Sequence, residues 1–336
     1  MPVKILEDIG DVLTKASRAE LISAIIAASG RTIVGETVTF KQPLIDGVSN
    51  IELLKSWGAD MVTINHYNVD MPMIPGMTST EQGVGEFLSH WNVQHARGIA
   101  PDRAIVESSV QNAFLQFGFG RVIGEAKRLA GIPVGITLEP VAENDQFPKA
   151  RLATMVNAQK AISQGANYIT LIHTPSMDRN AFLGCVKEVR QGVKEGGLVN
   201  AGKMPWGGSF LQSPDDFITE EEIRGLAKAG ADVVIVPAPG TVPGLTVELV
   251  RKWVLLIHEC GLLAETTIGT SQEGADVEVI RRFAIDSKMT GADIHQIGDS
   301  VYSGTTTPEN LMAFATSIKG RRHTLRRMAI SPLRGE

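Results

Sequence analysis

The sequence predicts an α/β fold in which eight strand–helix units close into one (β/α)8 barrel over residues 1–336. The first observation behind this prediction is a repeat. Four helical stretches end in Gly-Ala-Asp or Gly-Ala-Asn and lead into a short apolar strand: WGADMVTINH from Trp57, QGANYITLIH from Gln164, AGADVVIVPA from Ala229 and TGADIHQIGD from Thr290. Glycine closes a helix in the left-handed conformation, and the acid or amide turns the chain into the strand.

The second observation is a set of four further strands between these copies. They are RTIVGET from Arg31, IPVGITLEP from Ile132, LVNAGKM from Leu198 and LLAETTIGT from Leu262. Helix-start signals fit the gaps: Ser17 with Glu20, Thr219 with Glu222, and Thr307-Pro308. Alternating strands and helices indicate a parallel sheet, and eight units favour a closed barrel over an open doubly wound sheet.

Two segments lie outside the regular pattern. Residues 1–30 precede the first strand, and an amphipathic helix over Ser17–Ser29 is expected to close the barrel floor. Residues 67–117 form a long insertion after the second strand, and connections of that length are usually functional or interfacial. Its methionines suit a lid or a subunit contact, and the subunit contact is the favoured interpretation. We therefore expect a homo-oligomer.

Composition narrows the class of protein. The chain has 336 residues, 43% of them hydrophobic, and a net charge of -5, so it has material for a core and no general attraction to nucleic acid or anionic membrane. The N-terminus carries acids and lacks the apolar core of a signal peptide, and no apolar run is long enough to span a bilayer. Cys185 and Cys260 show no metal or redox spacing. These features predict a cytoplasmic protein. The basic run Lys319–Arg327 is interpreted as a solvated helix face or a subunit contact.

Candidate site residues follow from the fold, because the carboxyl ends of the strands form the active site of such barrels. The polar residues expected there are Glu36, Asn65, His66, Glu139, His173, Lys203, Glu265, Thr267, His295, Gln296 and Asp299. Strand alternation turns Glu36, Asn65, Glu139 and Glu265 into the barrel, and only one of His295 and Gln296 can face it. Titratable groups on one rim are what a catalytic centre needs.

Glu139 is the preferred working carboxylate, as a general base or a metal ligand. The structural alternative is a salt bridge to Lys203 or to an arginine across the barrel mouth. Together with Glu36 and Glu265 it could hold Mg²⁺ or Mn²⁺, although no HxH, HExxH or Cys/His spacing supports a metal. Metal dependence stays open at this point.

His173 and Lys203 are each open to more than one interpretation. His173 ends the IHTP segment and serves either as an acid or electrophile or as a hydrogen-bonded structural histidine. Lys203 forms a Schiff base with a carbonyl substrate, neutralises a substrate anion, or is an ordinary solvated lysine.

The last two loops suit an anion. Gly269-Thr270-Ser271 follows the seventh strand and Gly298-Asp299-Ser300 the eighth. Glycines let backbone N–H groups approach a ligand and hydroxyls add donors. The negative charge of Asp299 would repel a bare phosphate, so a water or a metal ion lies between them or Asp299 acts as a base. The alternative is that both loops only form turns. Substrate contacts are expected from these loops together with Glu36, Asn65 and His295.

With its strands laid out, the segment over residues 30–320 resembles the phosphate-binding TIM-barrel enzymes, on topology and on these two loops. The resemblance implies an aldolase, epimerase, isomerase or lyase acting on a small phosphorylated or keto-acid metabolite. The segment DIHQIGDSVYSG also resembles a family of uncharacterised bacterial barrel proteins, some labelled haloacid-dehalogenase-like. That label does not fit, because the chain lacks a DxDx[TV] nucleophile loop.

The leading hypothesis is a lyase or isomerase that acts on a small anionic metabolite. Glu139 abstracts a proton next to a carbonyl, His173 or Lys203 stabilises the enolate, and the backbone at Gly269 and Gly298 holds the anionic end. Three alternatives stay open. They are a Schiff-base aldolase built on Lys203, a hydrolase with a metal held by three glutamates, and a non-catalytic metabolite-binding protein.

Overall fold

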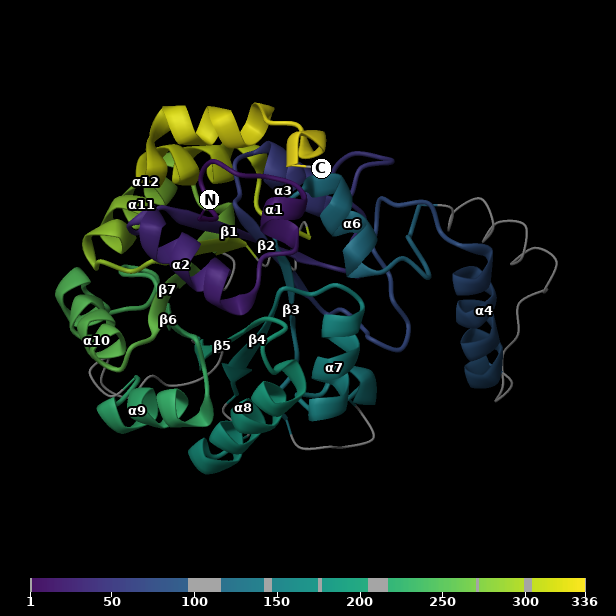
Figure 1. Ribbon diagram of the computed structural model, residues 1–336, viewed down its shortest axis with the longest axis horizontal. Helices are drawn as coiled ribbons and strands as arrows, with labels where there is room; N and C mark the ends of the chain where they lie inside the picture. Colours follow the sequence, from purple (N-terminus) through teal and green to yellow (C-terminus); the bar gives the residue numbers. More distant parts are fainter. Residues whose placement is uncertain are drawn as a thin grey trace.

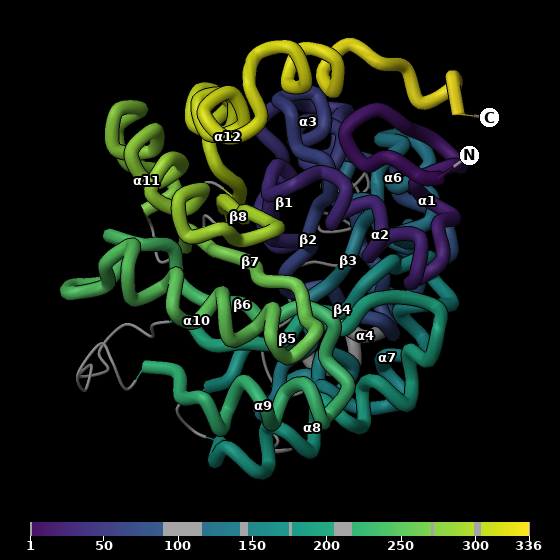
Figure 2. The backbone as a smooth tube through the Cα atoms, turned by 60° about the vertical axis from the view of Figure 1, so that its left-hand side comes forward, coloured from purple at the N-terminus to yellow at the C-terminus, as the bar shows by residue number. Residues whose placement is uncertain are grey.

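The computed structural model describes residues 2–95, 116–141, 147–174, 177–204, 217–269, 272–298 and 304–335. Within them, eight parallel strands pair in chain order and the last closes on the first (Figures 1 and 2). The predicted (β/α)8 fold class is therefore confirmed. The strands are β1 (Thr32–Val38), β2 (Met61–Asn65), β3 (Val134–Thr137), β4 (Tyr168–His173), β5 (Leu198–Lys203), β6 (Val233–Pro237), β7 (Leu263–Ile268) and β8 (Ile294–Gly298).

Helices surround this barrel, as both ribbon and tube views show (Figures 1 and 2). The capping boxes at Ser17 and Thr219 are confirmed, and Thr307 caps the last long helix with Pro308 at its first position. None of the described helices has the length and apolarity to cross a membrane. The helices are α1 (Asp11–Thr14), α2 (Arg18–Ala28), α3 (Asn50–Ser56), α4 (Glu81–His95), α6 (Ile123–Ala130), α7 (Met155–Ser163), α8 (Arg179–Val193), α9 (Glu220–Ala229), α10 (Val247–Glu259), α11 (Val277–Met289) and α12 (Pro308–Ala329), with short 3₁₀ turns η1 (Lys149–Arg151), η3 (Gln272–Gly274) and η4 (Pro332–Gly335).

The Gly-Ala-Asp/Asn repeat joins the strands in pairs. In each copy the glycine has a positive φ, and the acid or amide that follows makes a two-way link to the start of the preceding strand. Its side chain accepts the backbone N–H of one residue there, and its own N–H donates to that residue's carbonyl. The side-chain bonds are Asp60 to Ile33 (3.0 Å), Asn167 to Val134 (3.2 Å), Asp232 to Val199 (2.8 Å) and Asp293 to Ala264 (2.8 Å).

The barrel floor is apolar and is covered by α2. Leu21, Ala24 and Ile25 of this helix belong to one buried cluster with the first inward side chains of the strands. Figure 2 shows α2 lying across one end of the barrel, as the sequence predicts. The inward side chains of the floor are Val34, Met61, Tyr168, Leu198, Val233, Leu263 and Ile294. Water is therefore excluded from the lower half of the interior.

The insertion after β2 carries α4, which stands away from the barrel in Figure 1. Its base is held by backbone bonds from Ile74 to Gly118 (3.2 Å) and from Thr80 to Phe119 (2.8 Å). Gly118 is required there, because a Cβ would lie 1.8 Å from the Ile74 carbonyl oxygen. Residues 96–115 lie outside the described residues, so a lid or interface role stays a prediction.

A buried ion cluster joins the C-terminal helix to the barrel. Asp60, whose side chain is fully buried, contacts the Lys319 ammonium at 2.6 Å and the Arg327 guanidinium at 3.0 Å. Burial lowers the pKa of Lys319 to about 8, against the opposing effect of Asp60. The prediction of a solvated face is wrong for these two basic residues, because Asp60 draws them inward, whereas Arg321 and Arg322 are exposed.

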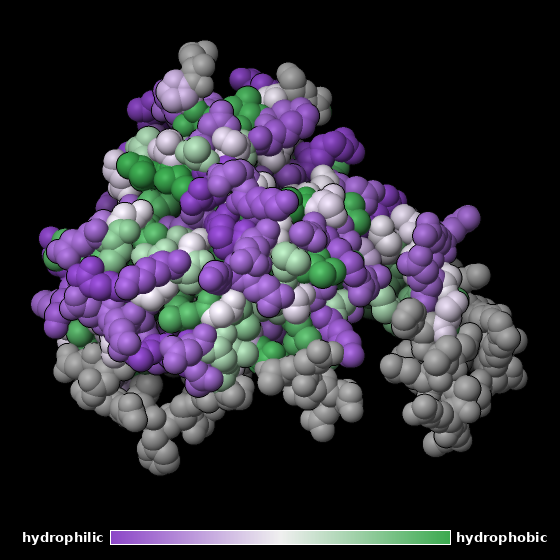
Figure 3. Space-filling view, turned by 60° about the horizontal axis from the view of Figure 1, so that its bottom comes forward, coloured by the Kyte–Doolittle hydropathy of each residue, from purple (hydrophilic) through white to green (hydrophobic). Residues whose placement is uncertain are grey.

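Surface hydrophobicity is dispersed on the face seen in Figure 3. Green hydrophobic patches are small there and are separated by hydrophilic residues. Such scattered apolar residues are normal on a protein surface. This face therefore gives no sign of an extended apolar contact.

Asp60→Ala is expected to destabilise the protein by about 3–5 kcal/mol, because two buried cations lose their counter-charge. Urea unfolding followed by circular dichroism measures the change. The matched control is Asp70→Ala, which removes a half-exposed partner of Lys160 and costs under about 1 kcal/mol. Equal effects of the two substitutions would contradict the structural role of Asp60.

Candidate active site

Above the floor, the inward side chains of the strands change from apolar to polar. Alternation along each strand turns every second residue into the lumen. We call the set above the floor the polar layer. It comprises Glu36, Thr63, Thr137, Thr170, Asn200, Glu265, Thr267 and Gln296, all of which are buried.

Glu36 and Gln296 meet inside the barrel. The Gln296 amide donates to the Glu36 carboxylate at 2.5 Å, and both side chains are buried. Gln296 therefore faces the lumen, and its neighbour His295 faces the helices. His295 bonds through Nδ1 to the Thr266 hydroxyl (2.8 Å) and through Nε2 to the Gly30 carbonyl (3.2 Å). Burial lowers the pKa of His295 to about 4, so the ring is neutral, and the expected substrate contact from His295 is wrong.

Glu265 is an acid of the polar layer whose pKa is strongly raised. Its side chain is 1% exposed, and its nearest polar partners, the Asn200 amide and the Thr267 hydroxyl, lie 3.5 Å away. In the described part of the chain no cation pairs with it. Burial raises the pKa of Glu265 to about 8, opposed only by Thr267. At neutral pH the carboxyl therefore holds its proton and can donate it.

Tyr168 forms the boundary between floor and polar layer. Its ring lies over Gly135, where a Cβ would be 2.3 Å from the ring, and its hydroxyl is 2.9 Å from the Thr63 hydroxyl. Burial raises the pKa of Tyr168 well above its usual value, and the charges of Glu265 and Glu36 raise it further. Both carboxyls therefore act on the same buried hydroxyl, which stays protonated.

Glu139 lies at the rim and is engaged by an arginine. Its carboxylate is 2.8 Å from Arg151 in η1, both side chains are mostly buried, and the two backbones bond as well. Glu139 is therefore in a salt bridge, but its partner Arg151 comes from the loop after the same strand and not from across the barrel mouth. Asn65 is nearby and accepts the backbone N–H of His66 (2.8 Å). Burial and the Arg151 charge lower the pKa of His66 to about 4.

His173 and Lys203 lie outside the lumen. Alternation puts Ile172 and Gly202 inside, because they share a face with Tyr168 and Asn200 respectively. His173 bonds to the Met177 carbonyl at 2.8 Å and stacks on Phe182. Their predicted place in a common lumen with the glutamates is therefore wrong.

Lys203 has partners of its own outside the barrel interior. Its ammonium is 3.5 Å from Glu222 of α9 and 5.6 Å from the centre of the Phe217 ring. The side chain is about one-third exposed. Among its three interpretations, the structure favours an ordinary, partly solvated lysine.

The expected set of three metal-binding glutamates is not assembled. Glu36 and Glu265 face the lumen, whereas Glu139 pairs with Arg151 at the rim. Within the residues that the structure describes, no group of three or more His, Cys, Asp or Glu side chains has the geometry to hold a metal ion. An inward position in the strand alternation therefore does not by itself bring a residue at the rim close enough to share a metal ion with residues deeper in the lumen.

The loops after β7 and β8 are described in part. Gly298 has a φ of 122° and lies against β1, where a Cβ would be 2.6 Å from the Glu36 carbonyl oxygen. Gly269 is buried, and a Cβ there would be in ordinary van der Waals contact with Met204, 3.5 Å away. The predicted anion-binding residues Thr270, Ser271, Asp299 and Ser300 lie outside the described residues.

Sequence reasoning missed Tyr168 and Asn200 as lumen groups. The alternation of YITLIH and LVNAGKM contains the signal for both, since Tyr168 shares a face with Thr170 and Asn200 with Gly202. For Gln296 the sequence left two adjacent candidates. The hydrogen bond to Glu36 settles which of them faces inward.

A family model described as "Domain of unknown function (DUF7916)" matches residues 9–334. The chain belongs to this family. No curated protein matches it. Neither this model nor the structural likenesses support the haloacid-dehalogenase-like resemblance.

Solved structures share the barrel of this DUF7916 chain at low identity. One is an archaeal fructose-1,6-bisphosphate aldolase whose catalytic lysine is covalently bound to the carbinolamine intermediate, with 13% identity, a TM-score of 0.53, and coverage of 88% of this chain and 96% of that chain. Another is a Schiff-base-forming fructose-1,6-bisphosphate aldolase, with 12% identity, a TM-score of 0.51, and coverage of 88% and 98%. These likenesses show the fold.

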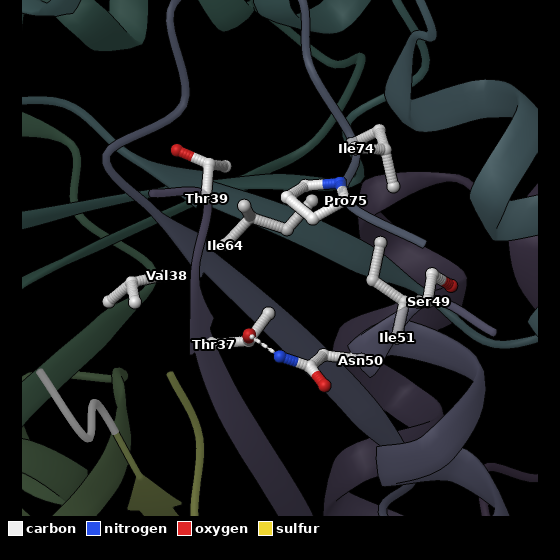
Figure 4. Close-up of a pocket in the computed structure, with 9 residues that line it drawn as sticks. All are labelled: Thr37, Val38, Thr39, Ser49, Asn50, Ile51, Ile64, Ile74 and Pro75. Atoms are coloured by element: carbon white, nitrogen blue, oxygen red, sulfur yellow. Dashed lines mark hydrogen bonds between the residues drawn. The ribbon is translucent and has the colours of Figure 1, made fainter. Parts of the chain in front are cut away.

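A small pocket of the DUF7916 chain lies beside the lumen, between the end of β1, the start of α3 and the segment at Ile74 (Figure 4). There Asn50 donates to the Thr37 hydroxyl at 3.0 Å, and Thr37 donates to the Gly304 carbonyl at 2.7 Å. The cavity volume is about 10 Å³, room for about one water. It is therefore too small for a metabolite.

The pH dependence of stability tests the burial of Glu265. Its pKa rises from 4.5 to about 8 on folding, so the folded state binds more protons between these values and loses stability as the pH rises through them. The slope reaches at most about 1.4 kcal/mol per pH unit. Glu265→Gln cannot titrate, so its stability relative to the wild type is expected to increase between about pH 5 and about pH 8.

Urea titrations at both pH values measure this difference. Glu259→Gln removes an exposed glutamate of α10 and controls for the loss of one negative charge. A constant difference between Glu265→Gln and the wild type across the window would show that Glu265 is ionised in the fold.

Proposed function

We propose that this chain is an enzyme of the lyase or isomerase class that transfers a proton next to the carbonyl group of a small metabolite. The observation that carries the proposal is Glu265, a fully buried carboxyl in the barrel lumen whose pKa is about 8. Perturbed acids of this kind concentrate at catalytic centres. The fold it shares with Schiff-base-forming aldolases supports the lyase class.

In this proposal the two lumen carboxyls have opposite roles. Glu36 removes a proton from the carbon next to the carbonyl, and the proton of Glu265 is donated toward the carbonyl oxygen, where negative charge develops. The Gln296 amide holds one oxygen of Glu36 and so orients the base. In an isomerisation, Glu36 then gives its proton to the former carbonyl carbon while Glu265 takes the proton of the neighbouring hydroxyl. In a lyase reaction, Glu265 takes back the proton of the enol, the carbonyl re-forms as the bond to the leaving group breaks, and the leaving group takes the proton of Glu36.

This assignment moves the base from Glu139 to Glu36. The Glu139 carboxylate is bound to Arg151, and that pairing opposes protonation of the acid. Glu139 and Arg151 then shape the rim, and Gly269 and Gly298 offer backbone near the anionic end of a phosphorylated or keto-acid substrate. His173 and Lys203 take no part.

The Schiff-base alternative gains no support from the described lumen. Such a mechanism needs a lysine amine facing the substrate, and none of the lumen-facing positions of β1–β8 is a lysine. Lys203 instead contacts Glu222 outside the strands. Similar folds host different chemistries, so the likeness to aldolases does not transfer the lysine mechanism.

Solvent hydrogen exchange tests the proposal without a known product. Small carbonyl metabolites incubated with the protein in D₂O are expected to gain deuterium next to the carbonyl, detected by NMR. Glu265→Gln is expected to slow this exchange by about 10²–10⁴-fold, the contribution of one general acid or base. The fold of the variant is checked by circular dichroism.

The matched control is Lys203→Met, which is expected to exchange at the wild-type rate. Borohydride reduction in the presence of substrate is expected to leave Lys203 unmodified. Exchange that survives in Glu265→Gln, or an adduct on Lys203, would contradict the proposal. No exchange with any carbonyl metabolite would favour a binding protein without catalysis.

A further inference from the structure

The lumen has a one-sided electrostatic character. Its inward positions on β1–β8 carry two carboxyls, Glu36 and Glu265, and no lysine, arginine or histidine. The apolar floor below excludes water, so a charge on Glu36 is weakly screened there. A carboxylate or phosphate that enters the lumen meets Glu36 and gains no counter-ion from these strands.

Two polar atoms of the layer lack a partner. The Asn200 side chain is 2% exposed and its Oδ1 has no hydrogen bond, although its amide nitrogen is directed at Glu265. The Thr137 side chain is 5% exposed and its Oγ1 also has none. A buried polar atom without a partner costs free energy, and a ligand that supplies the partner recovers it.

The donors and acceptors of the layer define the complementary ligand. The Asn200 oxygen only accepts hydrogen bonds, so it needs a donor. Glu265 in its protonated form donates one and needs an acceptor. The Thr137 hydroxyl does either. A carbonyl group with a hydroxyl on the neighbouring carbon supplies both an acceptor and a donor within a few bonds. An ammonium group supplies donors only, so it cannot accept the proton of Glu265.

We infer that the group which enters the lumen is a neutral hydroxy-carbonyl group, bound through its hydroxyl to the Asn200 oxygen and through its carbonyl to Glu265. The negatively charged end of the metabolite stays outside the polar layer. This inference rests on the proposed function, because it uses the same site, and it narrows the substrate class. It favours hydroxy-carbonyl compounds over α-keto acids, whose carboxylate adjoins the carbonyl.

Two probes of equal size separate these classes. Hydroxyacetone carries a hydroxymethyl group on the carbonyl carbon where pyruvate carries a carboxylate. Hydroxyacetone is expected to raise the melting temperature of the full chain in a concentration series, because it binds only the folded state, and pyruvate is expected to raise it less. Asn200→Ala is expected to weaken hydroxyacetone binding about tenfold, as for one lost hydrogen bond.

A pH series on the wild type keeps the test independent of how the variant folds. Hydroxyacetone binding is expected to weaken as the pH rises through about 8, where Glu265 loses its proton. The groups around Glu265 are Tyr168 from β4, Asn200 from β5, Ile235 from β6 and Thr267 from its own strand, and Glu36 from β1 acts on the same Tyr168 hydroxyl. Tyr168 stays protonated throughout, because its pKa lies well above this range.

Three outcomes would overturn the inference: pyruvate binding at least as tightly as hydroxyacetone, no binding of hydroxyacetone, or unchanged binding to a folded Asn200→Ala variant. The proposed function fails separately. If the protein binds hydroxyacetone selectively but exchanges deuterium into no carbonyl compound, the proposed enzyme activity is wrong and the inference about the bound group stands. If exchange occurs only in α-keto acids, the proposed activity stands and the inference about the bound group is wrong.

Discussion

The register between neighbouring strands controls the chemistry of this barrel, and four reciprocal links at the strand starts hold that register. In β1–β2, β3–β4, β5–β6 and β7–β8, an aspartate or asparagine side chain accepts an N–H of the preceding strand while its own N–H donates back. Side chains alternate with a period of two, so a slip of one residue would exchange the lumen set for the helix-facing set. Asp60 adds the buried Lys319 and Arg327 to the first link and so ties α12 to it.

The burial that stabilises the interior also raises the pKa of Glu265. Desolvation in the buried lumen above the apolar floor keeps Glu265 protonated at neutral pH, whereas Glu36 is held by an amide. Two carboxyls in one enclosed space with different partners are a recurring arrangement for acid and base roles. The stability of the fold and the protonation of Glu265 therefore depend on the same desolvation. The pH dependence of the free energy of unfolding reports on the pKa of Glu265, and hence on its ability to donate a proton.

Fold likeness and site chemistry diverge in this protein. The chain shares its barrel with aldolases that form Schiff bases, yet its inward strand positions carry no lysine, and Lys203 contacts α9 instead. The closed barrel only guarantees that inward residues of different strands meet. Which reaction follows depends on the residue types at those positions, and here they are acids, amides and hydroxyls.

The sequence by itself determined the eight strands, the capped helices, the floor helix and the inward position of Glu36 and Glu265, because periodicity, helix caps and strand alternation are local properties. Tertiary structure decided the rest. Gln296 rather than His295 faces inward because it meets Glu36 on β1, Lys203 is held outside the barrel by Glu222 of α9, and Glu139 is paired because η1 delivers Arg151. The pKa of Glu265 likewise depends on desolvation by many strands and a helix at once, which no local pattern records.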